Sequence, residues 1–279
     1  MNYLERFFKE KINRQGETLS ENTRINYESD INQFLTYVGK DELNITASDV
    51  SEWYGTKRNE YELTSLSRKV NALKSYFRFL LNIKVIESNP MDVLPNFKPK
   101  AKDKRVLSKE ELNAIIRQSK SPRDEAIIQT LASTGIRISE LINLRLSDLD
   151  EESIVVTGKG NKDREIFLSE KAKLSIKEYL TTRKDTDIDN LFINNNGKPM
   201  SEQTVRGTIK TLSKRAMIDN YDEISPHTFR RTFATLLANN GVPVPTIQKS
   251  LGHEDISTTM LYIKVDNTQV KKAMCMGLY

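Results

Sequence analysis

Apolar residues in the first third of the chain recur three and four positions apart, which is the spacing of an amphipathic helix. The longest such pattern predicts a helix over residues 64–82. Its apolar stripe consists of Leu66, Val70, Leu73, Phe77, Leu80 and Leu81. Shorter runs lie at 4–12 and 31–38, and Thr46 with Asp49 marks another helix start. We therefore expect residues 1–97 to form an all-helical domain.

The opposite face of the 64–82 helix carries short hydrogen-bonding side chains and arginines, and no acidic residue. Its members are Thr64, Arg68, Asn71, Ser75 and Arg78. Such side chains suit the reading of base edges and phosphates in a major groove, although an ordinary solvated face has the same pattern. We take Thr64, Arg68 and Asn71 as candidate DNA-binding residues, together with Thr23 and Arg24.

A break in the helical pattern falls at residues 89–106. It holds three prolines, at positions 90, 95 and 99, followed by a run of lysines and an arginine. Prolines prevent a continuing helix, and like charges keep such a segment extended. Ser108 and Glu111 then form the signature of a capping box that starts a new helix. We expect a linker at 98–106 and a second domain at 107–279; a surface loop inside a single domain is the alternative.

The second part of the chain mixes helices with one β-hairpin. Helical patterns at 124–131 and 138–146 lie on either side of Thr134-Gly135. Strands are expected at 153–157 and 164–168, joined by the turn sequence GKGNKD. Further helices are expected at 169–183, 201–217, 227–239, 243–250 and 257–264. The predicted fold is therefore mainly α, of the α+β class, with a small antiparallel sheet.

Composition excludes several classes of protein. The chain has 279 residues, enough for two domains. Its mean hydropathy is −0.55, and it lacks an apolar run of about 18 residues, so we expect no membrane-spanning helix. A single cysteine, Cys275, rules out an internal disulfide or a cysteine-ligated zinc. We expect a cytoplasmic protein whose net charge of +5 is compatible with a nucleic-acid partner.

Several residues that could take part in a chemical reaction lie near the end of the chain. His227 and Arg230 lie three positions apart and so share one helical face. His253 follows Gly252, which can end a helix, and Tyr262 comes nine residues later. Two histidines 26 residues apart are too few for a metal site, so we expect no metal. Satisfied structural histidines are the alternative.

Two earlier basic residues add to this set. Arg137 follows a helix-ending glycine, and Glu140, three positions on, can orient it. Lys159 lies between two glycines at the hairpin tip, where the backbone can approach a ligand closely, although most such lysines are solvated turn residues. The GKG sequence lacks the spacing of a phosphate-binding P-loop, so we expect no nucleotide cofactor.

The chain resembles the tyrosine recombinase (phage integrase-like) family in its short Xer-like form. The motifs that carry the resemblance are TGIRISELINL, TGKGNKDREI, SPHTFRRTFATLLANNG, LGH and ISTTMLYIKV. They match the family in order and spacing over most of residues 107–265. Residues 1–97 match more loosely, as a helical SAM-like core-binding domain, through TRINYESDINQFL and SRKVNALKSYFRFL.

The resemblance implies a catalytic set and a reaction. The set is Tyr262, Arg137, Lys159, His227, Arg230 and His253. Glu140 would support this set by orienting Arg137. Tyr262 would attack a DNA phosphodiester and form a 3′-phosphotyrosyl intermediate, without metal, ATP or other cofactor. The two arginines would bind the phosphate oxygens, Lys159 would protonate the leaving 5′-oxygen, and His227 would accept the tyrosine proton. His253 would be a further donor to the phosphate.

The resemblance also implies partners. The substrate would be double-stranded DNA with an inverted-repeat core site, held in a clamp by both domains. Gln203 and Arg206, on the helix that begins at Ser201, would read the major groove. The assembly would be a homotetramer on synapsed DNA, with or without a related recombinase. The tail at 266–279 would dock on a neighbouring subunit or pack in cis.

Some positions depart from the Xer pattern. Arg231 stands where many members have histidine, and Ile263-Lys264 follow the tyrosine where Thr-His is common. Chromosome dimer resolution, cointegrate resolution and integration of circular or mobile DNA therefore stay open as roles. A type IB-like topoisomerase and a non-catalytic, site-specific DNA-binding accessory protein are the competing functions.

Overall fold

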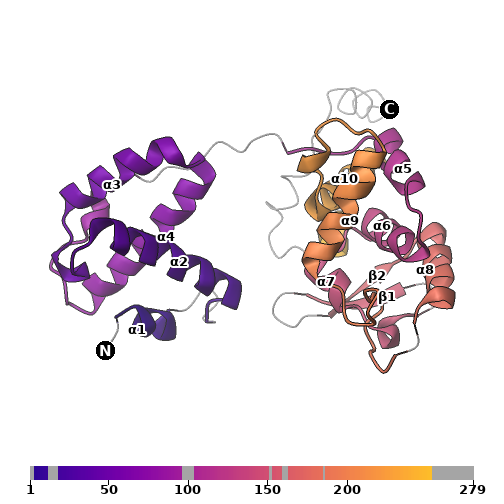
Figure 1. Ribbon diagram of the computed structural model, residues 1–279, viewed down its shortest axis with the longest axis horizontal. Coiled ribbons are helices and arrows are strands. Elements are labelled where there is room, and N and C mark those ends of the chain that lie inside the picture. Colours follow the sequence, from indigo (N-terminus) through magenta and orange to yellow (C-terminus); the bar gives the residue numbers. More distant parts are fainter. Residues whose placement is uncertain are drawn as a thin grey trace, which may run out of the picture. The chain divides into compact units, whose positions relative to one another are not determined.

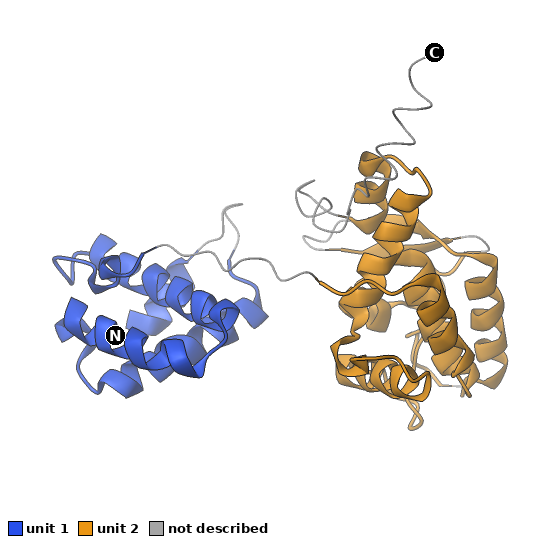
Figure 2. Ribbon diagram, turned by 90° about the horizontal axis from the view of Figure 1, so that it is seen from above, with its two compact units in different colours: residues 1–102 blue, residues 103–279 orange. Residues whose placement is uncertain are grey.

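The structure is a computed structural model that describes residues 3–11, 18–95, 104–150, 153–158, 163–184 and 186–252. The chain divides into two compact units, residues 1–102 and 103–279 (Figure 2). Each unit has its own hydrophobic core. The described part is mostly helical with one two-stranded antiparallel sheet, which confirms the predicted fold class. None of the described helices is long and apolar enough to cross a membrane.

Unit 1 is built around one long helix. Its helices are α1 (Tyr3–Glu10), α2 (Glu21–Val38), α3 (Ala47–Glu60) and α4 (Leu63–Asn82) (Figure 1). Helix α4 confirms the helix predicted at 64–82 and packs against the other three. Aromatic rings fill the interface edge-to-face, with Phe34 5.1 Å from Trp53 and 6.0 Å from Phe77 between ring centroids.

Local side-chain signals set where these helices begin and end. Thr46 and Asp49 form the predicted start of α3, because each side chain accepts a hydrogen bond from the backbone N–H of the other. Ser20 caps the start of α2, because its side chain accepts a hydrogen bond from the Thr23 backbone N–H. Helix α2 stops at Gly39, which adopts the left-handed conformation at φ 65°.

Unit 2 surrounds a buried central helix. Its helices are α5 (Lys109–Arg117), α6 (Pro122–Thr134), α7 (Ile138–Asn143), α8 (Glu170–Thr182), α9 (Glu202–Arg215), α10 (Pro226–Asn239) and α11 (Val244–Leu251). Helix α6 packs against α8 and α10 and also contacts α5 and α9 (Figure 1). The predicted capping box of Ser108 and Glu111 starts α5. The helix predicted at 257–264 lies outside the described residues.

The predicted hairpin is present in unit 2. Strand β1 (Ser153–Thr157) pairs antiparallel with β2 (Asp163–Phe167), with Val155 opposite Glu165. The second strand begins one residue earlier than expected. Ile154, Val156 and Ile166 point into the core of the unit, so the hairpin is held to the body of unit 2 by one apolar face.

The helix expected at 138–146 is shorter than predicted. Helix α7 ends at Asn143, and the chain then pairs with the segment 189–191. The backbone N–H of Leu191 donates to the Leu144 carbonyl and that of Leu146 donates to the Asp189 carbonyl, both at 2.7 Å. These long-range hydrogen bonds replace the last helical turn, because tertiary pairing overrides local helix propensity.

Candidate active site

Arg137 is positioned by the junction of two helices. Helix α6 ends at Gly135, whose φ of 61° turns the chain sharply. Arg137 then stands at the cap position of α7, where Glu140 accepts from its backbone N–H at 2.9 Å and from its Nη1 at 2.8 Å. The guanidinium of Arg137 is thereby oriented, while its side chain keeps 31% exposure. An oriented, part-exposed guanidinium can bind an anionic oxygen.

Glu140 binds a second arginine. Arg164, on β2, donates Nη1 and Nη2 to the two oxygens of the Glu140 carboxylate, each at 2.8 Å. Burial by itself would raise the pKa of Glu140. The hydrogen bonds and positive charge of Arg164, with the hydrogen bonds of Arg137, outweigh burial and lower this pKa to about 2. Glu140 is therefore a carboxylate throughout the neutral range.

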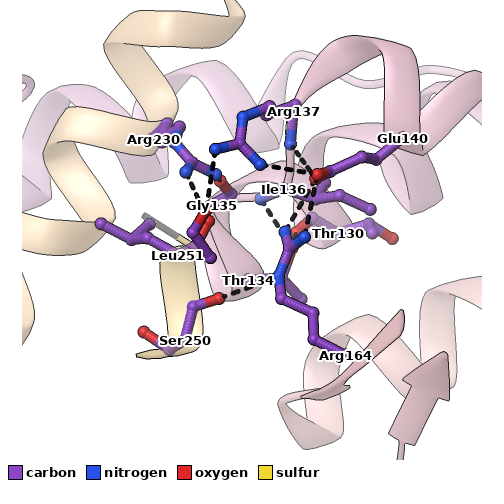
Figure 3. A network of polar contacts seen from close by, with 11 residues as sticks. Thr130, Thr134, Gly135, Ile136, Arg137, Glu140, Arg164, Arg230, Ser250 and Leu251 are labelled. Carbon is purple, nitrogen blue, oxygen red and sulfur yellow. Dashed lines mark hydrogen bonds and ion pairs between the residues drawn. The ribbon is translucent and has the colours of Figure 1, made fainter. Parts of the chain in front are cut away.

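Three arginines meet the end of helix α11 (Figure 3). Arg230, on α10 and only 2% exposed, donates Nη1 to the Gly135 carbonyl at 2.7 Å. The backbone carbonyls of residues 250–252 each accept a hydrogen bond from a different arginine. Arg164 Nε donates to Ser250 at 3.4 Å. Arg230 Nη2 donates to Leu251 at 2.5 Å, and Arg137 Nη2 donates to Gly252 at 3.0 Å. The α6–α7 junction, the hairpin and α10 are thus joined at one place.

His227 lies one helical turn before Arg230, at the start of α10. His227 lines a cavity of about 180 Å³ together with Arg137 and Arg230. The pKa of His227 lies below its ordinary value because neighbouring protein partly excludes water and because nearby cations disfavour a charged ring. In decreasing order of effect these cations are Arg230, Arg231, Arg206 and Lys104. A neutral imidazole beside two guanidinium groups can accept a proton at neutral pH.

Lys159, His253 and Tyr262 lie outside the described residues. Their described neighbours border the site: Gly158 lines a second cavity, of about 740 Å³, that also includes Arg137. Gly252 ends α11 in the left-handed conformation, as predicted from the sequence, and its carbonyl accepts from Arg137. Within the described ranges, no three His, Cys, Asp or Glu side chains converge as a metal site.

The two DNA-binding candidates of unit 2 are both exposed on α9. Arg206 also lines the 180 Å³ cavity with His227, and its Nη2 lies 3.1 Å from the Glu202 carboxylate. Gln203 does not line this cavity. Helical spacing and the family resemblance put Gln203 and Arg206 in one group, and of these two the structure brings Arg206 next to the catalytic candidates.

The candidates of unit 1 include an ion pair that the helix pattern could not reveal. Thr64, Arg68 and Asn71 are exposed on α4, as expected, whereas Ser75 is half-buried. Arg68 pairs with Asp30, which comes from α2 and is 2% exposed.

The remaining two candidates of unit 1 lie at the start of α2. The guanidinium of Arg24 lies 5.7 Å from the centre of the Phe8 ring. The hydroxyl of Thr23 shares a 2.8 Å hydrogen bond with Ser20 at the cap of the helix. Both side chains thus have contacts within unit 1.

Arg164 is the residue of this site that sequence reasoning missed. A signal was available in the strand pattern. Residues alternate across a strand, so Arg164 lies on the same side of β2 as the buried Ile166. An arginine at an inward-facing strand position needs a partner inside the unit, and Glu140 is that partner.

Both units match known protein families. A model of the phage integrase family matches residues 105–269, and a model of the phage integrase N-terminal SAM-like domain matches residues 4–84. The chain is 34% identical over 271 residues to tyrosine recombinase XerD of Halalkalibacterium halodurans, which covers 91% of this chain and 90% of that protein. It is 31% identical over 271 residues to tyrosine recombinase XerC of Listeria welshimeri serovar 6b, covering 90% of each.

A solved structure extends the comparison to the fold. The crystal structure of the XerH site-specific recombinase bound to palindromic difH substrate, a post-cleavage complex, matches with a TM-score of 0.77 at 21% identity. The match covers 94% of this chain and 81% of that one. The family match at 105–269 includes every position proposed from the sequence as catalytic. The chain therefore belongs to the phage integrase family and is a tyrosine recombinase, an enzyme of site-specific DNA recombination.

Proposed function

We propose that the chain cuts and rejoins DNA at a specific site through Tyr262, with Arg137, Lys159, His227, Arg230 and His253 as the other catalytic residues. The observation that carries this proposal is the convergence of Arg137, Arg230 and His227 on one cavity of about 180 Å³. These side chains come from two elements far apart in the sequence. Together they supply two forked cations and one neutral base, the groups that a phosphodiester transfer needs.

The arginines act on the phosphate. Negative charge grows on the two nonbridging oxygens as the nucleophile adds, and Arg137 and Arg230, which line the same cavity, would supply positive charge and N–H donors to them. Arginine suits this role better than lysine because its planar fork matches the geometry of phosphate. Glu140 supports the proposal by holding Arg137 at both its backbone N–H and its side chain.

Strand cleavage is a nucleophilic substitution at the phosphorus atom. The Tyr262 oxygen forms a bond to phosphorus, the bond to the 5′-oxygen breaks, and the product is a 3′-phosphotyrosyl linkage with a free 5′-hydroxyl. His227 accepts the tyrosine proton, and Lys159 gives a proton to the leaving 5′-oxygen. His253 donates to the phosphate. The new ester retains the energy of the diester, so the second strand can be joined by the reverse step without ATP.

Recognition and assembly follow from the same proposal. Residues 1–97 would bind DNA as a SAM-like core-binding domain, 98–106 would link it to the catalytic domain at 107–279, and α9 would read the major groove through Gln203 and Arg206. The substrate would be an inverted-repeat core site in double-stranded DNA; XerH was crystallised on a palindromic substrate. The site of action would be the cytoplasm.

The active assembly would be a homotetramer on synapsed DNA, alone or with a related recombinase. The tail at 266–279 would join neighbouring subunits. Deleting this tail should leave single-site binding intact and abolish tetrameric complexes in sedimentation on DNA. Tetramers that persist after the deletion would refute the role of the tail.

Cleavage mapping tests the function. Covalent protein–DNA adducts would be mapped on DNA that flanks the coding region of this protein, and the mapped site would be placed in a nicked suicide duplex. The unaltered chain should accumulate a 3′-phosphotyrosyl adduct, whereas Tyr262→Phe should bind the duplex and form none. An adduct that persists in Tyr262→Phe would refute the assignment of Tyr262 as the nucleophile. Relaxation of plasmids that lack any mapped site would instead indicate topoisomerase activity.

A further inference from the structure

We propose that Arg164 is a positioning residue for recombination, which holds Arg137 and the end of helix α11 in their working places. This inference rests on the proposed function of Arg137 and of the residue that follows α11. Arg164 lies on β2, outside the set that the sequence motifs indicate for the phosphate. Its side chain is 14% exposed, so it acts on the substrate through other residues.

The contacts of Arg164 reach two elements at once. Its two terminal nitrogens bind both oxygens of Glu140, the residue that holds Arg137. Its Nε donates to the carbonyl of Ser250, in the last turn of α11. All five donors of an arginine lie in one plane, so one guanidinium fixes α7 and α11 relative to each other.

Arg164 also packs closely against the backbone of Gly252. A Cβ at this position would lie 3.1 Å from the Cδ, Nε and Cζ atoms of Arg164. The backbone of Gly252 therefore packs closely on the guanidinium of Arg164. Gly252 immediately precedes His253, and the Gly252 carbonyl accepts a hydrogen bond from Arg137. A shift of Arg164 would therefore move the backbone that positions both Arg137 and His253, two of the proposed phosphate ligands.

The hairpin gives this arrangement a third connection. Arg164 is the second residue of β2, and the loop before this strand carries Lys159. A single side chain thus links the strand that follows Lys159, the helix that begins after Arg137 and the helix that ends before His253. Positioning matters for rate, because a displacement of about 1 Å of a catalytic group can cost about 100-fold.

Lysine at position 164 separates charge from geometry. Arg164→Lys keeps the positive charge but cannot bind both Glu140 oxygens and Ser250 together. We expect this variant to bind the mapped site with the affinity of the unaltered chain and to form the covalent adduct about 100-fold more slowly at saturating protein. The probe is the nicked suicide duplex. Adduct formation at the unaltered rate would overturn the proposal.

Arg123→Lys is the matched control. Arg123 also binds a carboxylate with Nε and Nη2, at 3.3 and 3.2 Å from one oxygen of Asp124. It lies at the start of α6, about 20 Å along this helix from Gly135. Both variants lose a two-donor contact to a carboxylate and some stability, but only Arg164→Lys should slow cleavage. Equal slowing in the two variants, at equal fractions folded, would indicate a purely structural role and overturn the proposal.

A double-mutant cycle tests whether Arg164 acts through Arg137. In an Arg137→Lys background, Arg164→Lys should slow adduct formation much less than in the unaltered chain, because residues that act as a unit are not additive. Equal costs in both backgrounds would overturn the positioning role. Where Arg164→Lys does not fold, Arg164→Gln replaces it in the same cycle with the same two outcomes.

The two proposals can fail separately. If the unaltered chain forms no adduct on any mapped site, the proposed function fails before Arg164 is tested. If the unaltered chain forms the adduct and Arg164→Lys behaves like Arg123→Lys, only the positioning role of Arg164 fails.

Discussion

Arg230 donates a 2.5 Å hydrogen bond to the backbone carbonyl of Leu251. This bond joins α10 to the last residue of α11, and a small apolar cluster of Ala234, Ile247 and Leu251 packs the same two helices together. Because Arg230 is 2% exposed, its charge depends on such carbonyls for solvation. The helix that carries His227 and Arg230 is therefore fixed to the helix that leads to His253.

His227 should make cleavage sensitive to acid only below the ordinary histidine pKa. In the proposed mechanism the neutral ring accepts the tyrosine proton, and the pKa of His227 is lowered. We therefore expect a single-turnover cleavage rate that is flat around neutral pH and falls under acidic conditions. Removing the cation in Arg206→Ala should raise this pKa and move the acid limb to higher pH. Lys210→Ala, an exposed site on the same helix, should leave it in place; a limb that does not respond to Arg206→Ala contradicts the prediction.

Lys159 should be dispensable when the leaving group needs no proton. Lys159→Ala should cleave an ordinary suicide duplex about 100-fold or more slowly, since general acid catalysis contributes about 10²–10⁴-fold. A 5′-bridging phosphorothiolate should restore the rate, because a thiolate leaves without protonation. Arg137→Ala is the control and should not be rescued, because the proposed role of Arg137 concerns the nonbridging oxygens. A slow Lys159→Ala reaction on the sulfur substrate would show that this lysine binds rather than protonates.

Glu140 should contribute stability that depends on pH. Its pKa is about 2 in the folded chain against 4.5 ordinarily. A pKa that is lowered on folding stabilises above the unfolded value, so this contribution is present above about pH 4.5 and is lost as the pH falls toward about 2. The pH-dependent part amounts to about 3 kcal/mol. Urea unfolding at several pH values should show this loss in the unaltered chain and not in Glu140→Gln; parallel curves would contradict it.

Gly135 should tolerate alanine poorly for two separable reasons. Its φ is 61°, and a Cβ would lie 2.6 Å from a ring carbon of Phe233. Gly241→Ala is the matched control, because Gly241 has a φ of 80° in the same unit and open space around its Cα. Backbone strain should cost about 1–2 kcal/mol in both, and overpacking should add about 1–3 kcal/mol in Gly135→Ala. Equal unfolding free energies in the two variants would show that Phe233 moves aside freely.

Asp30 should be required for the stability of unit 1. Lys69, itself 6% exposed, donates to this carboxylate at 2.9 Å. Asp30→Asn leaves a buried ammonium without its counter-charge and should destabilise unit 1 by about 3 kcal/mol. Glu10→Gln removes an exposed pair with Arg6 and should change the unfolding free energy far less. Similar urea midpoints for the two variants would show that Gln33 and water suffice for Lys69.

Local features of this chain could be predicted from the sequence because their signals are local. The Ser108–Glu111 and Thr46–Asp49 boxes lie within four residues, and Gly252 ends α11 through its own φ of 64°. Contacts between distant segments had no such signal. Asp30 reaches Arg68 from another helix, and the pairing with 189–191 ends α7 early.

The catalytic candidates show the same division. Spacing placed His227 and Arg230 on one face of α10, and the cavity that both line agrees with that prediction. The approach of Arg137 to them depends on the packing of α6 against α10, which no short motif encodes. Arg164 was missed because its partner Glu140 lies 24 positions away.

The carbonyls at the end of α11 have an electrostatic consequence for DNA cleavage. Three guanidinium groups of like charge repel one another and would spread toward solvent in an open site. The carboxyl end of a helix carries partial negative charge, and here it stands among them. The work of assembling these cations is therefore done when the chain folds. Under the proposed function, an incoming phosphate would meet a preorganised site and would spend little of its binding energy on gathering them.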